Sequence, residues 1–164
     1  MDALDILKQM HMDAKAAFKK IAVAHPSERG GLWAKLHPQL ELHEQIEEQF
    51  VYDPVARDVG PRDAVLARWE HEHEAQVRDA DALMGRIARL DPGNAGWLQA
   101  VTSLASTLEG HIRHEEDDIW PRIRTGWGAE QLTQAGRLVE AAKSAAAAGA
   151  SAKDAIDSAM SAVK

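Results

Sequence analysis

Two short stretches of the chain, HEQIEE at residues 43–48 and HIRHEE at residues 111–116, share one pattern: a histidine followed four residues later by two glutamates. A shift of 68 residues (111 minus 43) superimposes them, and the same shift aligns the Leu-Glu pair at 40–41 with the one at 108–109. Residues four apart on an α-helix lie on one face, about one turn (~6 Å) apart. Each stretch therefore predicts a helix that presents a histidine and a carboxylate on the same side, and the chain contains an internal repeat.

Apolar residues recur at steps of three and four along most of the chain, which predicts helices rather than strands. Inside the second predicted helix, Pro38 has no backbone N–H, which predicts either a kink or a helix that begins there. The repeat relates the second helix to the fourth, and such a pseudo-twofold arrangement favours an all-α, antiparallel up-down four-helix bundle. The four helices are expected over about residues 2–24, 32–52, 62–90 and 95–120, with loops or turns at HPSERGG (25–31), DPVARDVGP (53–61) and DPGN (91–94).

The C-terminal part of the chain has a different composition, rich in alanine and poor in large apolar residues. It predicts one helix to about Ala147 and a second short helix capped by Ser151. Alanine favours helix strongly but buries little surface, so we expect a peripheral or partly loose segment. We accordingly divide the chain into a bundle, residues 1–122, and an alanine-rich helical appendage, residues 123–164.

Composition excludes several classes of protein. The 26 acidic and 19 basic side chains give a net charge of −7, which argues against binding to nucleic acid or to an anionic membrane surface. The chain has no cysteine, which excludes disulfides and thiolate metal sites. No apolar run approaches the roughly 18 residues of a membrane helix, and the acidic N-terminus is unlike a signal peptide. A cytoplasmic protein, monomeric or dimeric, is the expectation.

Polar residues occupy the faces that the helices should bury. Burying an ionised carboxylate without a partner costs roughly several kcal/mol, so the charges in such a bundle interior need a compensating positive charge. A pair of divalent metal ions supplies it, because imidazole and carboxylate are suitable iron ligands and bundle interiors are where such sites are built. A polar core without metal is the alternative. The candidate metal ligands are His11, His43, Glu47, His73, His111 and Glu115.

The heights of the four histidines along the bundle agree with a shared centre. His11 lies 13 residues before the first predicted turn and His43 lies 11 after it, whereas His73 lies 17 before the third turn and His111 lies 16 after it. At about 1.5 Å per residue, the two members of each pair agree to within about 3 Å. In an up-down bundle all four histidines are therefore expected at one level.

These residues resemble the hemerythrin-like HHE cation-binding domains. The resemblance covers about residues 2–122 and rests on the order His…H-x-x-x-E…His…H-x-x-x-E, on LDILKQMH (4–11), on EHEAQV (72–77), and on L-E-x-H-x-x-x-E-E leading to Trp-Pro (120–121). It implies a non-haem centre of two iron ions with oxo or hydroxo and carboxylate bridges, although manganese or zinc are possible occupants. It implies that the four histidines are terminal ligands, two on each iron in a pairing left open, and that Glu47 and Glu115 are the bridges.

One departure from the family affects the expected function. The oxygen-carrying hemerythrins have a second histidine on the third helix, four residues from the first, but here those positions hold Trp69 and Val77. Fewer ligands leave more open positions, which favours a catalase-like or other oxidant-handling reaction with hydrogen peroxide or dioxygen over oxygen transport. Reversible binding or sensing of dioxygen or nitric oxide, iron storage or iron-centre repair, and a purely structural metal are the alternatives.

Five further residues are candidates for the surroundings of the site. Trp69, one turn from His73, is expected to form a wall of the site or simply to pack in the core. Glu48 and Glu116 either hold ligating histidines or face solvent, and His114 either flanks the site or faces water. Tyr52, nine residues after His43, is expected near one end of the bundle.

Overall fold

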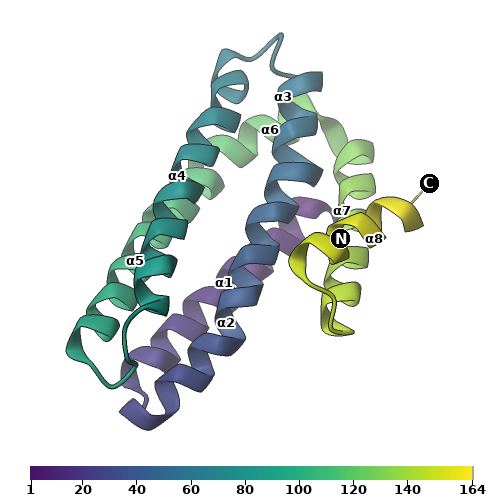
Figure 1. Cartoon of the computed structure of the whole chain (residues 1–164). Helices are drawn as coiled ribbons and strands as arrows, with labels where there is room; N and C mark the ends of the chain where they lie inside the picture. The colour runs from purple at the N-terminus through teal and green to yellow at the C-terminus, as the bar shows by residue number, and fades with distance from the viewer. Residues whose placement is uncertain (164) are drawn as a thin grey trace.

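The computed structural model describes residues 1–163, and within that range the chain is helical without any strand. Four long helices form the expected antiparallel bundle (Figure 1), so the predicted fold is confirmed. They are α1 (Ala3–Val23), α2 (Pro26–Ile46), α4 (Ala64–Ala88) and α5 (Ala95–His114).

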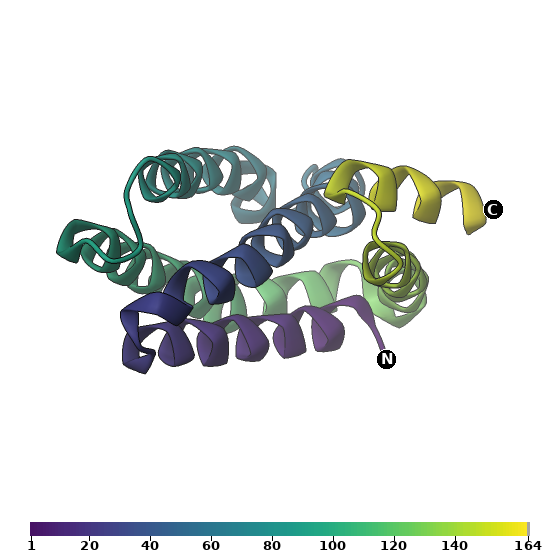
Figure 2. The same ribbon diagram turned by 60° about the horizontal axis from the view of Figure 1, so that its bottom comes forward.

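The bundle consists of two helical hairpins, α1–α2 and α4–α5, each closed by a short connection at the same end of the molecule (Figure 1). The two hairpins pack against each other chiefly along α1 and α5. Seen from another direction, α2 and α4 lie on the same side of this α1–α5 layer (Figure 2). Of the predicted connections, DPGN is the tight turn expected, because the side chain of Asn94 accepts from the N–H of Gly96 and caps α5.

Two predicted loops are wrong in whole or in part, because helix occupies most of each of them. HPSERGG was expected as a loop, but α2 begins at Pro26, where a missing N–H is harmless in the first turn, and His25 caps it. Pro38 therefore lies inside a helix rather than at its start. DPVARDVGP was also expected as a loop, but α3 (Asp53–Asp58) extends helical structure into it.

Each half of the internal repeat continues into a segment with i→i+5 hydrogen bonding, that is, a π-helix. These segments are η1 (Glu47–Tyr52) after α2 and η2 (Glu115–Ile119) after α5, and η2 continues as α6 (Trp120–Gly126). Both begin at the glutamate of an H-x-x-x-E pair. Short π segments inside α-helices are often found at functional sites.

The hydrophobic core is divided in two by the layer that contains the polar residues. One cluster is centred on the N-terminal half of α1 and on η1, with Leu4, Val51 and Ile123 fully buried. The other lies at the hairpin turns and includes Phe18 and Trp97. The polar residues thus lie between two apolar layers that exclude water from above and below.

The alanine-rich tail is more closely packed than its composition predicts. It forms α7 (Gly128–Ala147) and α8 (Ala152–Ala162), with Ser151 as the predicted cap. α7 packs against α1, and α8 packs against α7 and α2, while Leu132 and Val139 are buried in the first core cluster. Small side chains allow this close approach. The division of the chain at residue 122 stays a prediction, and no helix among residues 1–163 is long and apolar enough to cross a membrane.

Candidate metal centre

The six predicted ligands meet in the layer between the two core clusters. Four of them are almost completely inaccessible to solvent, namely His11, Glu47, His73 and Glu115, and they are joined by His43 and His111. Their ligand atoms form two groups, each with all members within 4.8 Å of one another: Glu47, His73, His111 and Glu115 in one, and His11, His43 and Glu47 in the other.

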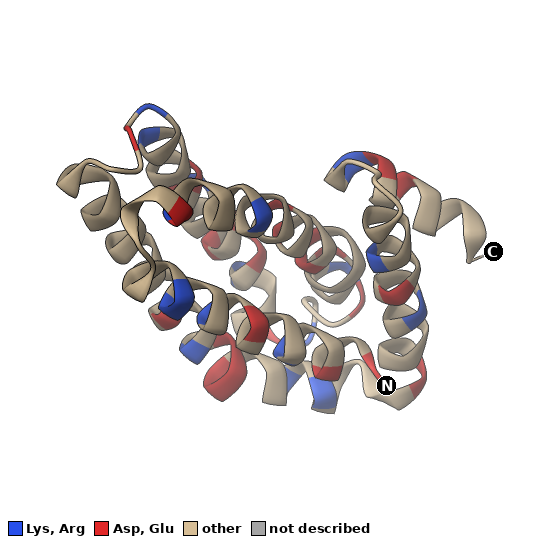
Figure 3. Cartoon of the chain, turned by 90° about the horizontal axis from the view of Figure 1, so that it is seen from below, with Lys and Arg blue, Asp and Glu red and all other residues tan. Residues whose placement is uncertain are grey.

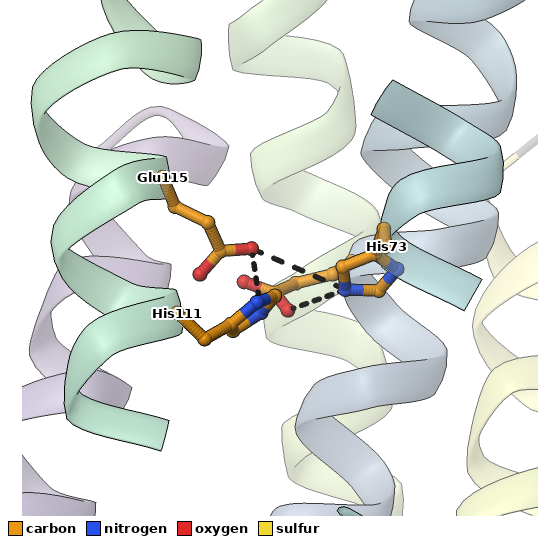
Figure 4. Close-up of side chains that lie close together, drawn as sticks. His73, His111 and Glu115 are labelled. Atoms are coloured by element: carbon orange, nitrogen blue, oxygen red, sulfur yellow. Dashed lines mark hydrogen bonds and ion pairs between the residues drawn. The ribbon is translucent and has the colours of Figure 1, made fainter. Parts of the chain in front are cut away.

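The structure pairs the histidines by hairpin. His11 of α1 and His43 of α2 face each other with their Nε2 atoms 3.0 Å apart. In the other hairpin, the rings of His73 and His111 lie 5.3 Å apart between centroids, and both project toward Glu115 (Figure 4). The pairing that the sequence left open therefore follows the fold, because consecutive antiparallel helices bring their histidines together.

Glu47 lies between the two histidine pairs and directs one oxygen to each. Its Oε1 is 3.0 Å from Nε2 of His43 and 3.5 Å from Nε2 of His11. Its Oε2 is 3.3 Å from Nε2 of His73. A carboxylate oriented in this way is suited to bridge two cations, each held by one histidine pair.

Glu115, the repeat partner of Glu47, has the same orientation from the opposite side. Its Oε1 is 3.1 Å from Nε2 of His111 and 4.0 Å from that of His73, and its Oε2 is 3.5 Å from that of His11. Figure 4 shows the ion pairs of Glu115 with His73 and His111. The internal repeat thus places two carboxylates at equivalent positions, each facing both histidine pairs.

The donor atoms of the site are satisfied poorly by one another. Oε1 of Glu47 and Oε2 of Glu115 are buried and have no hydrogen-bond partner, which normally costs about 1–3 kcal/mol per group. The nitrogen and oxygen atoms of these side chains, which come from several helices, lie close to common points without all forming hydrogen bonds with one another. Two divalent cations would fit this donor set, because carboxylate oxygen and imidazole nitrogen suit iron, manganese and zinc.

Glutamates beside the ligands hold two of the histidine rings. Nδ1 of His11 lies 2.9 Å from Glu116 Oε1, and Nδ1 of His73 lies 2.9 Å from Glu48 Oε2. A carboxylate only accepts, so each Nδ1 carries the proton and leaves the Nε2 lone pair for a cation. Glu48 and Glu116 thus contact imidazoles instead of facing only solvent, and their role as partners of metal ligands stays a prediction.

A third histidine is held by a residue that sequence reasoning missed. Nδ1 of His111 is hydrogen-bonded to the amide oxygen of Gln76 on α4. A glutamine three residues after His73 gives no recognisable signal in the sequence, because its partner lies on another helix.

Tyr52, one of the candidates for the surroundings, lies beside the site and not near the end of the bundle, where its spacing from His43 had placed it. Its hydroxyl donates to Oε1 of Glu115 at 2.6 Å and accepts from Nε1 of Trp120 at 3.1 Å. Nine residues at about 100° each would place Tyr52 opposite His43 on an α-helix, but the π segment η1 adds a residue to the turn and brings it back. Trp120 reaches the site through η2 in the same way and stacks on His11, with centroids 5.1 Å apart.

Trp69 forms a wall of the centre. Its ring stacks on His111 with centroids 5.9 Å apart and lies the same distance from His73. His114 contacts the outer side of Trp69 and pairs with Asp118 at 2.7 Å, so it flanks this wall and does not reach the ligand groups. His71, two residues before His73 and so on another face of α4, is exposed.

The charges of the site without a cation compensate one another. Burial lowers the pKa of His73, but its hydrogen bonds with Glu47 and Glu48 outweigh burial and raise that pKa to about 10. Burial raises the pKa of Glu47, but His43, His11 and His73 hold it well below its usual range. Glu47 therefore stays ionised and needs positive charge beside it, which protons or metal cations can supply.

A cavity of about 1060 Å³ reaches the centre from the side. Its lining includes His11, His43 and Gln76, and Glu44 stands in its wall one residue beyond His43. Burial and the nearby charge of Asp81 raise the pKa of Glu44 to about 8. Glu44 was not among the predicted residues, because a glutamate at this helix position also suits a solvated face.

Comparison with known proteins agrees with this geometry. The family model of the hemerythrin HHE cation binding domain matches residues 2–123. The chain belongs to this family. It is also similar to a DNA nickase of Nostoc sp. (strain PCC 7120 / SAG 25.82 / UTEX 2576), with 23% identity over 145 residues, which are 88% of this chain and 40% of that protein. The chain thus spans less than half the length of that relative, and no solved structure matches it.

Proposed function

We propose that this hemerythrin-family protein holds two iron ions and uses them to react with hydrogen peroxide, in a catalase-like reaction, or with dioxygen. The observation that carries the proposal is the orientation of Glu47 and Glu115. Each carboxylate directs one oxygen to the His11–His43 pair and the other oxygen to the His73–His111 pair. Such carboxylates suit a pair of cations better than one. Manganese and zinc suit the same donors.

The residues have separate roles in this proposal. One cation would be held by His11 and His43, the other by His73 and His111, and both carboxylates would bridge. When bound, the iron pair supplies redox equivalents and Lewis acidity. Glu116, Glu48 and Gln76 hold the imidazole rings in the ligating tautomer.

Two further features support a reaction with a small molecule. Tyr52 places an O–H donor 2.6 Å from a bridging carboxylate, where it stabilises negative charge and holds a proton within a buried site. Its pKa is raised well above the usual value by burial and by the charges of Glu115 and Glu47, so the proton stays on the hydroxyl. The lateral cavity gives peroxide or dioxygen a route to the centre.

The alternative functions use the same centre and differ in whether the bound small molecule is converted, bound reversibly, or absent while the metal itself is released. Reversible binding or sensing of dioxygen or nitric oxide needs the same ligands but no turnover, and iron storage or repair needs release of the metal. Iron donation ranks below the other two, because the chain has no cysteine to pass iron to a partner. Basic and acidic residues are interspersed along the helices (Figure 3) and the net charge is −7, which disfavours the DNA binding that an activity like that of the Nostoc relative would need.

The test is to purify the protein from iron-fed cells, measure iron per chain and the visible spectrum, and then add hydrogen peroxide. About two irons per chain with oxygen release is the expected result. Glu115→Ala should abolish oxygen release, while Glu72→Ala, an exposed glutamate of the same helix bundle, should leave it intact.

Three other results are informative. Oxygen release no greater than that of free iron would contradict the enzymatic proposal. A stable oxygenated or nitrosyl band without turnover would instead favour the carrier or sensor. If the protein nicks supercoiled plasmid DNA, as the name of the Nostoc relative would suggest, and the Glu115→Ala variant does so equally well, that activity is independent of this centre.

A further inference from the structure

We infer that the two cation positions are unequal: the His73–His111 position fills first and holds its cation more tightly than the His11–His43 position. This inference rests on the proposed function, because it requires two cations. It concerns the order in which they bind and the residue that sets the order.

The number of donors differs between the positions. Four ligating residues, Glu47, His73, His111 and Glu115, have donor atoms within 4.8 Å of one another, whereas only three form the group that contains His11 and His43. Glu115 contributes to the second position through Oε2, 3.5 Å from His11, but it lies outside that group. A cation at the first position therefore finds a more compact set of ligands.

The hydrogen bonds behind the histidines differ in the same direction. His11, His73 and His111 each have a partner on Nδ1. Nδ1 of His43 is buried and has none. Loss of a partner of this kind typically lowers metal affinity by about 10–100-fold, because the partner fixes the ring and its tautomer.

Matching α4 with α1 at their histidines, His73 with His11 (a shift of 62 residues), points to the reason for the missing hydrogen bond. Gln76, the partner of His111, lies three residues after His73 on α4, and the corresponding position three residues after His11 on α1 is Ala14. Ala14 lines the cavity beside His43, and its methyl group accepts no hydrogen bond. One side chain thus distinguishes the outer surroundings of the two positions.

The experiment is a titration of the metal-free full chain with Co²⁺ under anaerobic conditions, followed by calorimetry and by visible absorption. Two cations that share carboxylates repel each other, so two steps alone do not show which position fills first. Ligand variants do. His43→Ala should remove the weaker step and retain the tighter one, whereas His111→Ala should remove the tighter step.

A gain-of-affinity variant tests the role of Ala14. Ala14→Gln should tighten the weaker step by about tenfold and leave the tighter step unchanged. Ala16→Gln, an exposed alanine of the same helix, is the matched control and should change neither. Gln76→Ala should loosen the tighter step by about tenfold, and this variant is informative even if Ala14→Gln does not fold.

The outcomes separate this inference from the proposed function. Fewer than two Co²⁺ per wild-type chain would overturn the two-cation function and the inference with it. Two Co²⁺ with the tighter step lost in His43→Ala would overturn the inference alone. Unchanged affinities in both Ala14→Gln and Gln76→Ala would do the same.

Discussion

Among single residues, Tyr52 connects the two halves of the repeat most directly. It belongs to the first half, but it donates to Glu115 of the second half and accepts from Trp120. All three side chains are buried, so water cannot replace a lost partner. The hydroxyl of Tyr52 is therefore expected to contribute to stability as well as to the properties of the centre.

Tyr52→Phe removes this hydroxyl and leaves an indole N–H without a partner and a carboxylate oxygen without its donor. An unsatisfied buried group costs about 1–3 kcal/mol, so the metal-free variant should lose about that much free energy of unfolding. Urea denaturation of metal-free wild type and variant measures the loss. Tyr52→Phe with unchanged stability would mean that the hydrogen bond is not formed in solution. Metal content of the variant should remain near that of wild type, because Glu115 retains its histidine contacts.

The six candidate ligands could be predicted from the sequence because each lies on an otherwise apolar face of a single helix, and four of them form the two H-x-x-x-E pairs. A histidine four residues before a glutamate, on an otherwise apolar face, is visible without a structure. Gln76 could not be predicted in the same way, and Tyr52 could be named as a candidate but not placed beside Glu115. The role of Gln76 depends on a neighbouring helix, and that of Tyr52 depends on a local change of helical register.

At the scale of elements, η1 and η2 determine which side chains reach the centre. Each inserts one residue into an otherwise regular helix, and each begins at a bridging glutamate. Removing one residue from a π segment should restore an ordinary α-helix without rotating the residues on either side. Removing one residue from a regular helix should rotate the two sides by about 100° relative to each other.

Deletion of Asp117, an exposed residue of η2, should therefore preserve helicity and cation binding, with Trp120 still facing the site. Deletion of Ser103, an exposed residue in the regular part of α5, should abolish cation binding by rotating Trp97 and Val101 away from the core side that His111 shares. Circular dichroism and Co²⁺ binding compare the two. Equal damage by both deletions would show that the π hydrogen bonding is not a one-residue insertion.

Helix starts and ends were the least predictable elements. The bundle helices and the DPGN turn follow from periodicity and turn chemistry, but HPSERGG at 25–31, with two adjacent glycines that disfavour helix, predicts a loop. Tertiary contacts override that preference: Trp33 lies in the core and secures the first turns of α2. The π segments have no composition that distinguishes them from α-helix.

At the scale of the whole molecule, α7 attaches the tail to the start of the chain. Gly136 of α7 lies so close to the N-terminus that an added Cβ would stand 2.7 Å from the carbonyl oxygen of Met1 and 3.1 Å from the N atom of Ala3. Arg124 strengthens the same junction by pairing with Asp2 at 2.5 Å and Asp5 at 2.9 Å. Alanine-rich sequence predicted helices here, but it carries no pattern from which this docking could be predicted.

Gly136→Ala should consequently destabilise the chain by about 1–3 kcal/mol, the usual effect of overpacking. Gly110→Ala is the control, because a Cβ there would meet nothing within 4 Å. It should raise stability by about 0.5–1 kcal/mol through helix propensity. Thermal unfolding of both variants measures these shifts. Stabilisation by Gly136→Ala would show that the tail is not docked against α1.

The position of Glu47 in both ligand groups has a mechanical consequence. It is rooted in the α1–α2 hairpin, yet its Oε2 reaches toward His73 of the α4–α5 hairpin, and Glu115 reaches back toward His11. A cation pair held in this way would cross-link the two hairpins. Loading the centre should thus slow the opening of the molecule between its hairpins, so that resistance to proteolysis reports occupancy of a site no protease can touch.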